Sequence, residues 1–224
     1  MKYPILSVYN TFNTEPIARW SFDEAGNIAS ERPDVDPASL IDSVCRVVEP
    51  LQNGPQQSLL LTGGCVTFPV TPLLDIGKED FSICAWIRTE DYGIVNIIDK
   101  RIENSGPLQG WSFFIYQSKI NLQIADEKGW LNCGLDHIEK ILPFPVVSDN
   151  QWHHVAVAVD RDRVDGGRWY VDGKEVGWRF RPIFQQGLLS NNIPLTVGRR
   201  SDGFGGVFRG NIGDIRLYKR VLLA

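Results

Sequence analysis

Two adjacent histidines followed by a scatter of aspartates are the side chains in this 224-residue chain that invite a metal-binding or catalytic interpretation. They lie in "QWHHVAVAVDRDRVDGGRWYVDGKEVGW", residues 151–178. Successive residues of a β-strand point to opposite faces, so Trp152 and His154 are expected on one face and His153 and Val155 on the other. One metal ion needs both imidazoles on the same side, which in a strand requires spacing i, i+2. The pair is therefore predicted not to chelate a shared metal.

The rest of this segment has the pattern of a β-hairpin. "DRDRVDGG" has the charge and glycine content of a solvated loop, and "RWYVDGKEVGW" resumes the strand pattern around Asp172-Gly173. This dipeptide favours a type I′ turn, because both central residues need positive φ and Asp and Gly tolerate it. The prediction is strand, loop, strand, tight turn and strand.

Other catalytic and cofactor motifs are missing from the sequence. It contains no G-x-S-x-G, no H-E-x-x-H, no P-loop and no G-x-G-x-x-G that opens a helix. "GFGG" at 203–206 lies between two strand-like segments and is interpreted as a wide turn.

The four cysteines are widely spaced and form no C-x-x-C pair, which argues against a zinc ribbon or a thioredoxin-type centre. Free thiols are expected at Cys45, Cys65, Cys84 and Cys133. Cys84 shares a strand face with Trp86 in "FSICAWIR" and is interpreted as a small buried hydrophobic residue.

Charge and hydropathy exclude several classes of partner. The net charge of −4 offers no broad positive field for a phosphate backbone, so nucleic-acid binding is not expected. No stretch approaches the roughly 20 apolar residues that span a bilayer, so membrane insertion is not expected. The first 20 residues lack the apolar core of a signal peptide. A mature or excised form would also lack one, and the compartment stays open.

The distribution of turn residues favours an all-β domain. With 21 Gly and 13 Pro, the chain suits many short strands better than long helices. Strand-like segments recur at short intervals, a spacing typical of an antiparallel sandwich or barrel. The main irregular stretch is 23–43, where "PASLID" is interpreted as one helical turn. No composition shift marks a boundary, so a single domain over 1–224 is predicted. The expected strands are 17–23, 58–62, 65–70, 81–88, 94–101, 110–117, 119–126, 152–160, 168–173, 194–200 and 211–220.

Four phrases in a characteristic order carry a family resemblance. These are "ARWSFDE", "FSICAWIR", "QWHHVAVAVDR…WYVDGKEVG" and "PLTVGRR…FRGNIGDIRLYKRVL". Together they resemble the laminin G-like, concanavalin A-like jelly-roll superfamily, particularly its bacterial and pentraxin-related branches, over roughly residues 17–222. The resemblance implies two antiparallel sheets packed face to face. Because function varies widely on this fold, the site residues have to be argued separately.

The resemblance makes glycan cleavage a hypothesis that the sequence can test. Several glycoside hydrolases on this fold carry an E-x-D-x-x-E strand, which sets acid and nucleophile on one face. That spacing does not occur here, and strand acids such as Asp99 and Asp126 are isolated. A non-catalytic protein is therefore predicted.

Calcium is the metal that the resemblance implies, because related domains often hold a structural calcium ion. The matching positions are Asp23 in "SFDEAG" and Asp214 in "NIGDIR", on terminal strands that neighbour each other in such sandwiches. The long Pro-containing insertion after Glu24 departs from the family pattern at this point. Alternatively, Asp23 begins a loop and Asp214 pairs with Arg216 or another neighbour.

Sugar binding requires an exposed aromatic ring to stack on a pyranose, with amides or acids to bond hydroxyl groups. The candidates are Tyr92, Trp130 and Trp178, each expected in a loop or near a strand end. The alternative is that these rings cover an edge or close the core. Trp86 and Trp152, in apolar strands, are predicted core residues.

These observations predict a lectin-like recognition module whose partner is a glycan or glycoprotein. The alternatives are a protein-interaction or adhesion module on the same fold, and then a glycan-cleaving enzyme with an atypical acid pair. An exposed aromatic ring beside amides would favour sugar, and a flat apolar patch would favour a protein partner.

Overall fold

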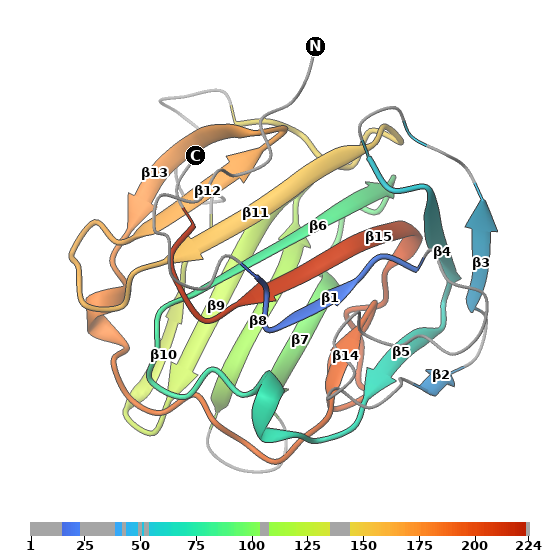
Figure 1. The fold of residues 1–224 in the computed structure, drawn as a ribbon. Coiled ribbons are helices and arrows are strands. Elements are labelled where there is room, and N and C mark those ends of the chain that lie inside the picture. Colours follow the sequence, from blue (N-terminus) through green and yellow to red (C-terminus); the bar gives the residue numbers. More distant parts are fainter. Residues whose placement is uncertain are drawn as a thin grey trace.

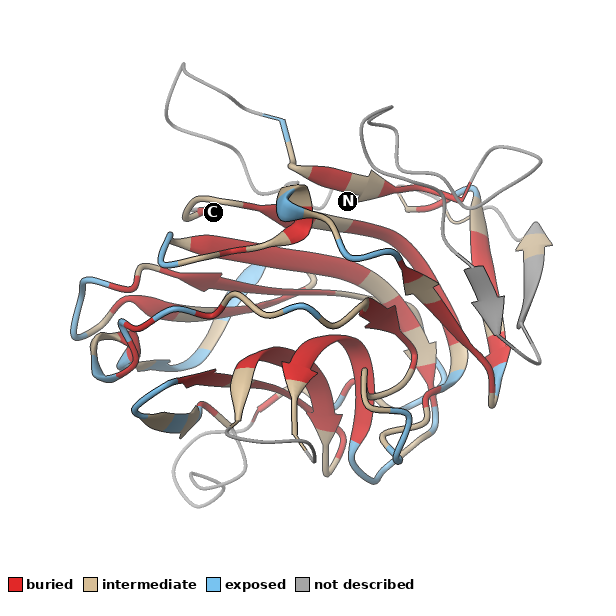
Figure 2. Ribbon diagram, turned by 90° about the horizontal axis from the view of Figure 1, so that it is seen from below, coloured by how far each residue is buried: buried red, intermediate tan, exposed pale blue. Residues whose placement is uncertain are grey.

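The chain folds as two antiparallel β-sheets packed face to face, as the sequence predicts (Figure 1). The computed structural model describes residues 15–22, 39–41, 44–48, 51, 54–103, 108–134 and 144–222. Buried residues follow the strands of both layers, as Figure 2 shows from below. Within the described ranges the only helical elements are two short 3₁₀ turns, η1 (Pro72–Leu74) and η3 (Pro182–Phe184).

The eight-stranded sheet forms the front layer of Figure 1, in the order β13-β12-β11-β6-β15-β4-β3, with β1 pairing to β15. Its strands are β1 (Ala18–Trp20), β3 (Val44–Val48), β4 (Gln57–Thr62), β6 (Phe81–Thr89), β11 (His153–Val159), β12 (Gly167–Val171), β13 (Lys174–Phe180) and β15 (Arg209–Tyr218).

The seven-stranded sheet lies behind it, in the order β10-β9-β8-β7-β14-β5-β2. Its strands are β2 (Ser39–Ile41), β5 (Cys65–Phe68), β7 (Val95–Ile102), β8 (Gln109–Tyr116), β9 (Lys119–Asp126), β10 (Gly129–Asn132) and β14 (Leu195–Val197).

Aromatic rings join the two sheets across the core. Trp20 of β1 packs on Phe68 of β5 with ring centroids 4.3 Å apart, and Phe81 of β6 faces Trp111 of β8 at 6.2 Å. All four rings are buried. Burying a large apolar side chain contributes about 1.5–3 kcal/mol, so these contacts are a substantial part of the sheet-to-sheet interaction.

The prediction that Trp86 and Trp152 are core residues is wrong, because both are only partly buried. Trp86 lies on the outward face of β6, where its ring packs on His154 with centroids 5.3 Å apart. Cys84 shares that face and is a buried free thiol, as expected, within an outer cluster that also includes Tyr170 and Tyr218. Burial raises the pKa of the Cys84 thiol to about 12, which makes the thiol unreactive at neutral pH.

The predicted helical turn at "PASLID" is also wrong where the structure describes it, since residues Ser39–Ile41 form β2. This strand pairs with the edge of β5, with Leu40 opposite Val66. Pairing gives the backbone groups of this segment hydrogen-bond partners in β5, whereas most of those groups would lack an internal partner in a single helical turn. Strands β3 and β10 were not predicted; they are short, with five and four residues.

The predicted facing of the two histidines is confirmed. His154 lies opposite Trp86 on the outward face, whereas His153 lies opposite Ile87, whose side chain is in the core. The two imidazoles therefore point apart, and the pair forms no shared chelate.

The predicted tight turn is confirmed as well. Asp172 and Gly173 have φ of 50° and 75°, and they connect β12 to β13 where Val171 pairs with Lys174. Two consecutive positive φ values are the defining feature of a type I′ turn.

The substitution Gly173→Val should destabilise the hairpin by about 1–2 kcal/mol, because a β-branched residue is strained at positive φ. A thermal melt should show a lower midpoint for this variant than for the parent. Lys174→Val, one residue further along the exposed strand, serves as the control and should change the midpoint little. An unchanged midpoint for Gly173→Val would contradict the assignment of turn strain to this position.

Candidate functional site

A continuous row of polar residues crosses the outward face of the seven-stranded sheet. Directly paired residues in antiparallel strands point to the same face, so the row can be followed through the register. The adjoining row points the other way and contributes Leu131, Ile124 and Trp111 to the core. In strand order the polar row contains Asn132, Gln123, Ser112, Asp99, Thr196, Thr67 and, by register alone, Ser39.

Among the side chains of this row that the structure describes, those at the β10 end are the most exposed. Asn132 is exposed and Gln123 is half-buried, whereas Ser112 and Asp99 are buried. Trp130 lies two residues before Asn132 on the same face, and 56% of its surface is exposed. The accessible end therefore places an indole ring beside two primary amides.

Asp99 is the one carboxylate in the polar row, and its oxygens are already occupied. The Asn96 amide donates to Asp99 Oδ2 at 3.1 Å, and the backbone N–H of Ser201 donates to Oδ1 at 2.9 Å. Burial raises the pKa of Asp99. Asn96 also donates to Ser112 Oγ at 2.6 Å, so the network joins β7, β8 and the β14–β15 loop.

Three amide oxygens on this face are buried without a hydrogen-bond partner, those of Asn96, Asn121 and Gln123. An unsatisfied buried acceptor costs about 1–3 kcal/mol, and such groups are commonly satisfied by ordered water. The sequence contained the signal for two of them, since Asn121 and Gln123 alternate with Ile and Leu in "KINLQIAD".

The three predicted ligand-binding aromatics are exposed but do not form a single site. Tyr92, 65% exposed, lies in the β6–β7 loop, and Trp178, 49% exposed, lies on β13 of the other sheet. Trp130 alone adjoins the polar row. Contact of any of the three with a ligand stays a prediction.

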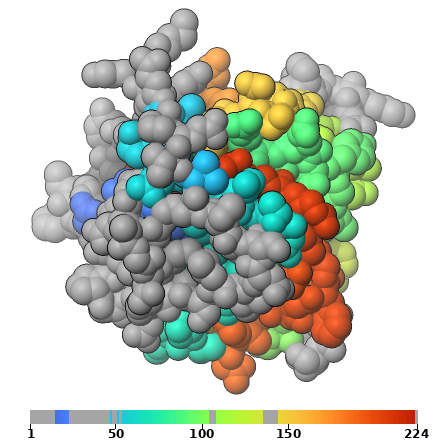
Figure 3. All heavy atoms as spheres, turned by 90° about the vertical axis from the view of Figure 1, so that its right-hand side faces the viewer, coloured from blue at the N-terminus to red at the C-terminus, as the bar shows by residue number. Residues whose placement is uncertain are grey.

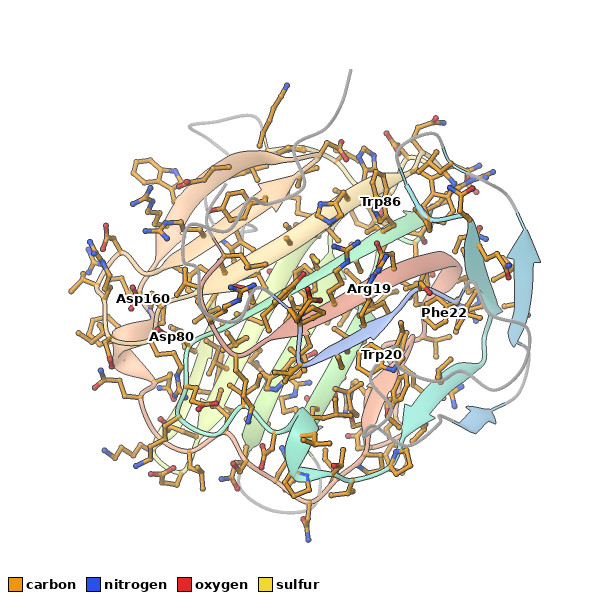
Figure 4. All side chains as sticks on the ribbon, viewed as in Figure 1. Arg19, Trp20, Phe22, Asp80, Trp86 and Asp160 are labelled. Carbon is orange, nitrogen blue, oxygen red and sulfur yellow. The ribbon has the colours of Figure 1, made fainter. Side chains whose placement is uncertain are left out.

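A buried arginine at the rim holds the loops that support β10. Arg161 is buried. Its guanidinium donates to the carbonyls of Gly77, Gln185 and Gly187. Its backbone N–H donates to Asp80 Oδ1 at 2.7 Å, and burial raises the pKa of Asp80. Figure 4 shows Asp80 and Asp160 at this rim. The sequence alone does not identify Arg161 as an anchor, because its partners lie in two distant loops, at 77–80 and 185–187.

Asp126, an isolated strand acid in the sequence, has an anchoring role in the structure. Its Oδ1 accepts from the N–H of Lys128 and its Oδ2 accepts from the N–H of Gly187, both at 2.8 Å. The carboxylate thus fixes the β9–β10 turn against the loop that Arg161 holds, and this arrangement positions the strand that carries Trp130.

The calcium prediction stays untested, because Asp23 lies outside the described residues. Asp214 occupies a bulge of β15 with φ of 40°. Strand β1 pairs with β15 beside this bulge, with Arg19 opposite Arg216, so the terminal strands meet as the family pattern implies. Over the described ranges, no three His, Cys, Asp or Glu side chains are grouped so that they could hold a metal.

Asp214 is the centre of an ion-pair cluster, as the alternative interpretation anticipated. Its Oδ1 accepts from Arg19 Nε at 2.8 Å and from Arg216 Nε at 3.0 Å, and its Oδ2 accepts from Arg216 Nη2. Burial raises the pKa of Asp214, but hydrogen bonds from Arg216 and Arg19 outweigh burial, and the pKa is lowered overall. Figure 4 shows Arg19 on β1, alongside β15.

His153 links the loop before β11 to the β12–β13 turn. Its Nδ1 lies 2.9 Å from Asp172 Oδ2 and its Nε2 lies 3.1 Å from Asp149 Oδ1. The hydrogen bond with Asp172 raises the pKa of His153 against the opposing effect of burial. By contrast, burial together with Arg216 lowers the pKa of His154 to about 4, so His154 is neutral at physiological pH.

The raised pKa of His153 predicts pH-dependent stability. A raised folded-state pKa contributes stability that is fully present below the unfolded value of about 6.5 and is lost as pH rises through the folded value. His153→Gln should therefore lower the melting temperature more at pH 5.5 than at pH 8.5, with divalent-metal binding unchanged. Thermal melts and calorimetry measure the two effects. His154→Gln is the matched control, and an equal loss at both pH values for His153→Gln would contradict the assigned contact.

Residues 62–224 match the family model of the concanavalin A-like lectin/glucanases superfamily. The chain belongs to this superfamily. No curated protein matches it in sequence. No helix in the described parts of the chain is long and apolar enough to cross a membrane.

Solved structures with the same fold include clostridial toxin binding domains. That of botulinum neurotoxin DC with SialylT has a TM-score of 0.65, 15% identity, and 93% of this chain aligned with 49% of that chain. The same domain with rat synaptotagmin II has a TM-score of 0.62 and 14% identity, with 93% of this chain aligned to 49% of that chain. The binding domain of Paraclostridial Mosquitocidal Protein 1 has a TM-score of 0.60 and 15% identity, with 84% of this chain aligned to 45% of that chain. The chain thus spans about half the length of these structures, and at this identity the likeness concerns the fold.

Proposed function

We propose that the protein is a non-catalytic module that recognises glycans through the β10 end of the polar row. The observation that carries this proposal is the placement of exposed Trp130 beside the amides of Asn132 and Gln123 on one sheet face. An indole ring packs on the apolar face of a pyranose, and the exposed amide of Asn132 can both donate to and accept from sugar hydroxyls. Strand β10 is the last strand in the described order of this sheet and its Trp130 is exposed, so a chain end or a branch can approach the ring.

Rigidity of the site supports the same proposal. The buried network around Asp99 fixes the centre of the sheet, and Asp126 with Arg161 fixes the turn before β10. A preformed site loses little conformational entropy on binding. This matters for sugars, because their hydroxyl groups exchange hydrogen bonds with water for hydrogen bonds with protein and gain little net free energy.

A binding role also accounts for the chemistry of the polar face better than catalysis does. Retaining and inverting glycosidases need two carboxyl groups about 5–10 Å apart. The polar row contributes Asp99 alone, and this carboxylate is buried and hydrogen-bonded. We therefore propose that the chain binds glycans without cleaving them.

A structural neighbour shows that a domain with this fold can take part in binding. The binding domain of botulinum neurotoxin DC was solved both with SialylT and with rat synaptotagmin II, so one domain that includes this fold takes a glycan and a protein. A glycan is the ligand we propose here, because the exposed Trp130 adjoins amides rather than a flat apolar surface.

A glycan array with the intact chain tests the proposal. Trp130→Ala should weaken binding to the recognised glycans by about tenfold or more, since stacking on an aromatic ring contributes on the order of 1.5 kcal/mol. Trp178→Ala, the same substitution at a similarly exposed ring on the other sheet, should leave the affinity unchanged.

Two outcomes contradict this proposal. An array on which the chain binds no glycan would contradict glycan recognition. Equal losses of affinity in the two tryptophan variants would contradict the placement of the site on the polar face. The same preparation, incubated with β-glucans, alginate and galactans, should release no reducing ends.

We also retain a structural calcium ion at Asp23 and Asp214 as a proposal. Calcium would compete with Arg19 and Arg216 for the Asp214 carboxylate, so its site depends on Asp23 and backbone carbonyls. At a hundredfold excess over the dissociation constant, calcium would stabilise the chain by about 2.7 kcal/mol.

Melting temperatures with excess calcium and with a chelator test this proposal. The parent should melt at a lower temperature in chelator, and the chelator-induced shift should disappear in Asp214→Ala. Comparing shifts rather than absolute temperatures separates calcium from the lost ion pairs. A parent that melts at the same temperature in both buffers has no structural calcium.

A further inference from the structure

Two neighbouring loops at one end of the sandwich carry three exposed apolar side chains, which we call the two-loop tip. Tyr92 and Ile94, in the β6–β7 loop, are 65% and 58% exposed, and Phe204, in the β14–β15 loop, is 70% exposed. Single exposed apolar residues are ordinary, but several from adjacent loops mark an interaction surface.

Hydrogen bonds hold the two loops side by side. The backbone N–H of Arg209 donates to Asp91 Oδ2 at 2.8 Å, and Thr89 Oγ1 donates to the Arg209 carbonyl at 2.6 Å. The N–H of Asn96 donates to the Gly206 carbonyl at 2.8 Å. Figure 3 shows the green and red parts of the chain adjoining on this side of the molecule. The three apolar side chains therefore belong to one end of the protein.

The loop that carries Phe204 is internally braced. The N–H of Phe204 donates to Asp202 Oδ1 at 2.9 Å, and Asp202 is ion-paired with Arg200. The N–H of Gly203 donates to the Arg200 carbonyl at 3.0 Å. A braced loop loses little backbone conformational entropy when its aromatic side chain is buried by a partner.

The glycines of the two loops show that the tip projects into open space. A methyl group added at Gly93, Gly203 or Gly205 would meet no atom within 4 Å. Such a projecting surface cannot enclose a peptide or a small molecule. Its side chains can be buried only in a concave partner or in a deformable apolar phase, and a lipid–water interface is such a phase. Tyr and Phe are also well suited to that interface, where amphipathic rings gather.

Charges around the tip indicate which lipid surface fits. Asp91 and Asp202 accept from backbone N–H groups within the loops, while Glu90 and Arg209 are exposed beside them. At physiological ionic strength only charges within about 8–10 Å of the membrane act on it, and those beside the tip are of both signs, Glu90 with Arg209 and Asp202 with Arg200. The tip therefore has no net attraction to an anionic surface, and a zwitterionic bilayer fits it.

We propose that the two-loop tip docks the protein on the surface of a zwitterionic lipid bilayer. Tyr92, Ile94 and Phe204 enter the interfacial layer, and the sandwich stays in water. This docking requires no apolar segment of spanning length and is consistent with the absence of one among the described helices. It does not involve Trp130, which lies on β10, so it is independent of the proposed glycan site.

Flotation of the intact chain with glycolipid-free phosphatidylcholine vesicles tests the proposal. The parent should float with the vesicles, and the double substitution Tyr92→Ser with Phe204→Ser should reduce the bound fraction about tenfold or more, given the apolar area of two aromatic rings. Adding phosphatidylserine should not increase the bound fraction.

Two control variants make the result specific. Phe184→Ser alters a side chain that is 64% exposed in η3, away from the tip, and Trp130→Ala alters the proposed glycan site. Both should float like the parent. Because the substituted side chains are exposed, circular dichroism and melting temperature should match the parent in every variant.

A spectroscopic measurement checks the depth of contact. Brominated phosphatidylcholine should quench the added emission of Phe204→Trp and leave that of Phe184→Trp unquenched. The proposal fails if the parent does not float, if Phe184→Ser loses binding as the tip variant does, or if the tip substitutions instead abolish self-association measured without lipid.

Discussion

Antiparallel pairing is the constraint on which the rest of this structure depends, because it forces directly opposed residues onto the same face of a sheet. In the seven-stranded sheet this produces two adjacent rows of opposite character. One row packs Leu131, Ile124 and Trp111 against the core, and the other presents Asn132, Gln123 and Ser112 outward. A slip of one residue would exchange the rows, so the packing of the core against the other sheet also fixes the polar face.

Buried polar groups then convert this register into a rigid framework. Asp99 and Asn96 connect β7 to β8 and to the β14–β15 loop, and Arg161 connects three loops at the opposite rim. Each is costly to bury without partners, so each holds its neighbours in one arrangement. The proposed glycan site and the two-loop tip are both held at the surface by such groups. The framework therefore separates two exposed aromatic surfaces that can serve different partners.

The acidic and histidine residues that first suggested chemistry serve mainly as structural links. His153 joins Asp149 to Asp172, Asp126 fixes a turn, and Asp214 lies between two arginines. This distribution explains why a chain with 27 acidic residues presents one buried carboxylate, Asp99, in its polar row. It also favours recognition over bond cleavage as the task of the protein.

The sequence by itself determined the fold class, the opposed facing of His153 and His154, and the turn at Asp172-Gly173, because alternation and positive-φ preferences act between near neighbours. Only the tertiary structure decided which strands adjoin and therefore which polar residues meet. It also decided that Trp86 lies on an outward face rather than in the core and that residues 39–41 form a strand on the edge of β5. It placed Trp130 beside amides while separating Tyr92 and Trp178 from it. These outcomes depend on contacts between residues far apart in the chain, which local patterns do not encode.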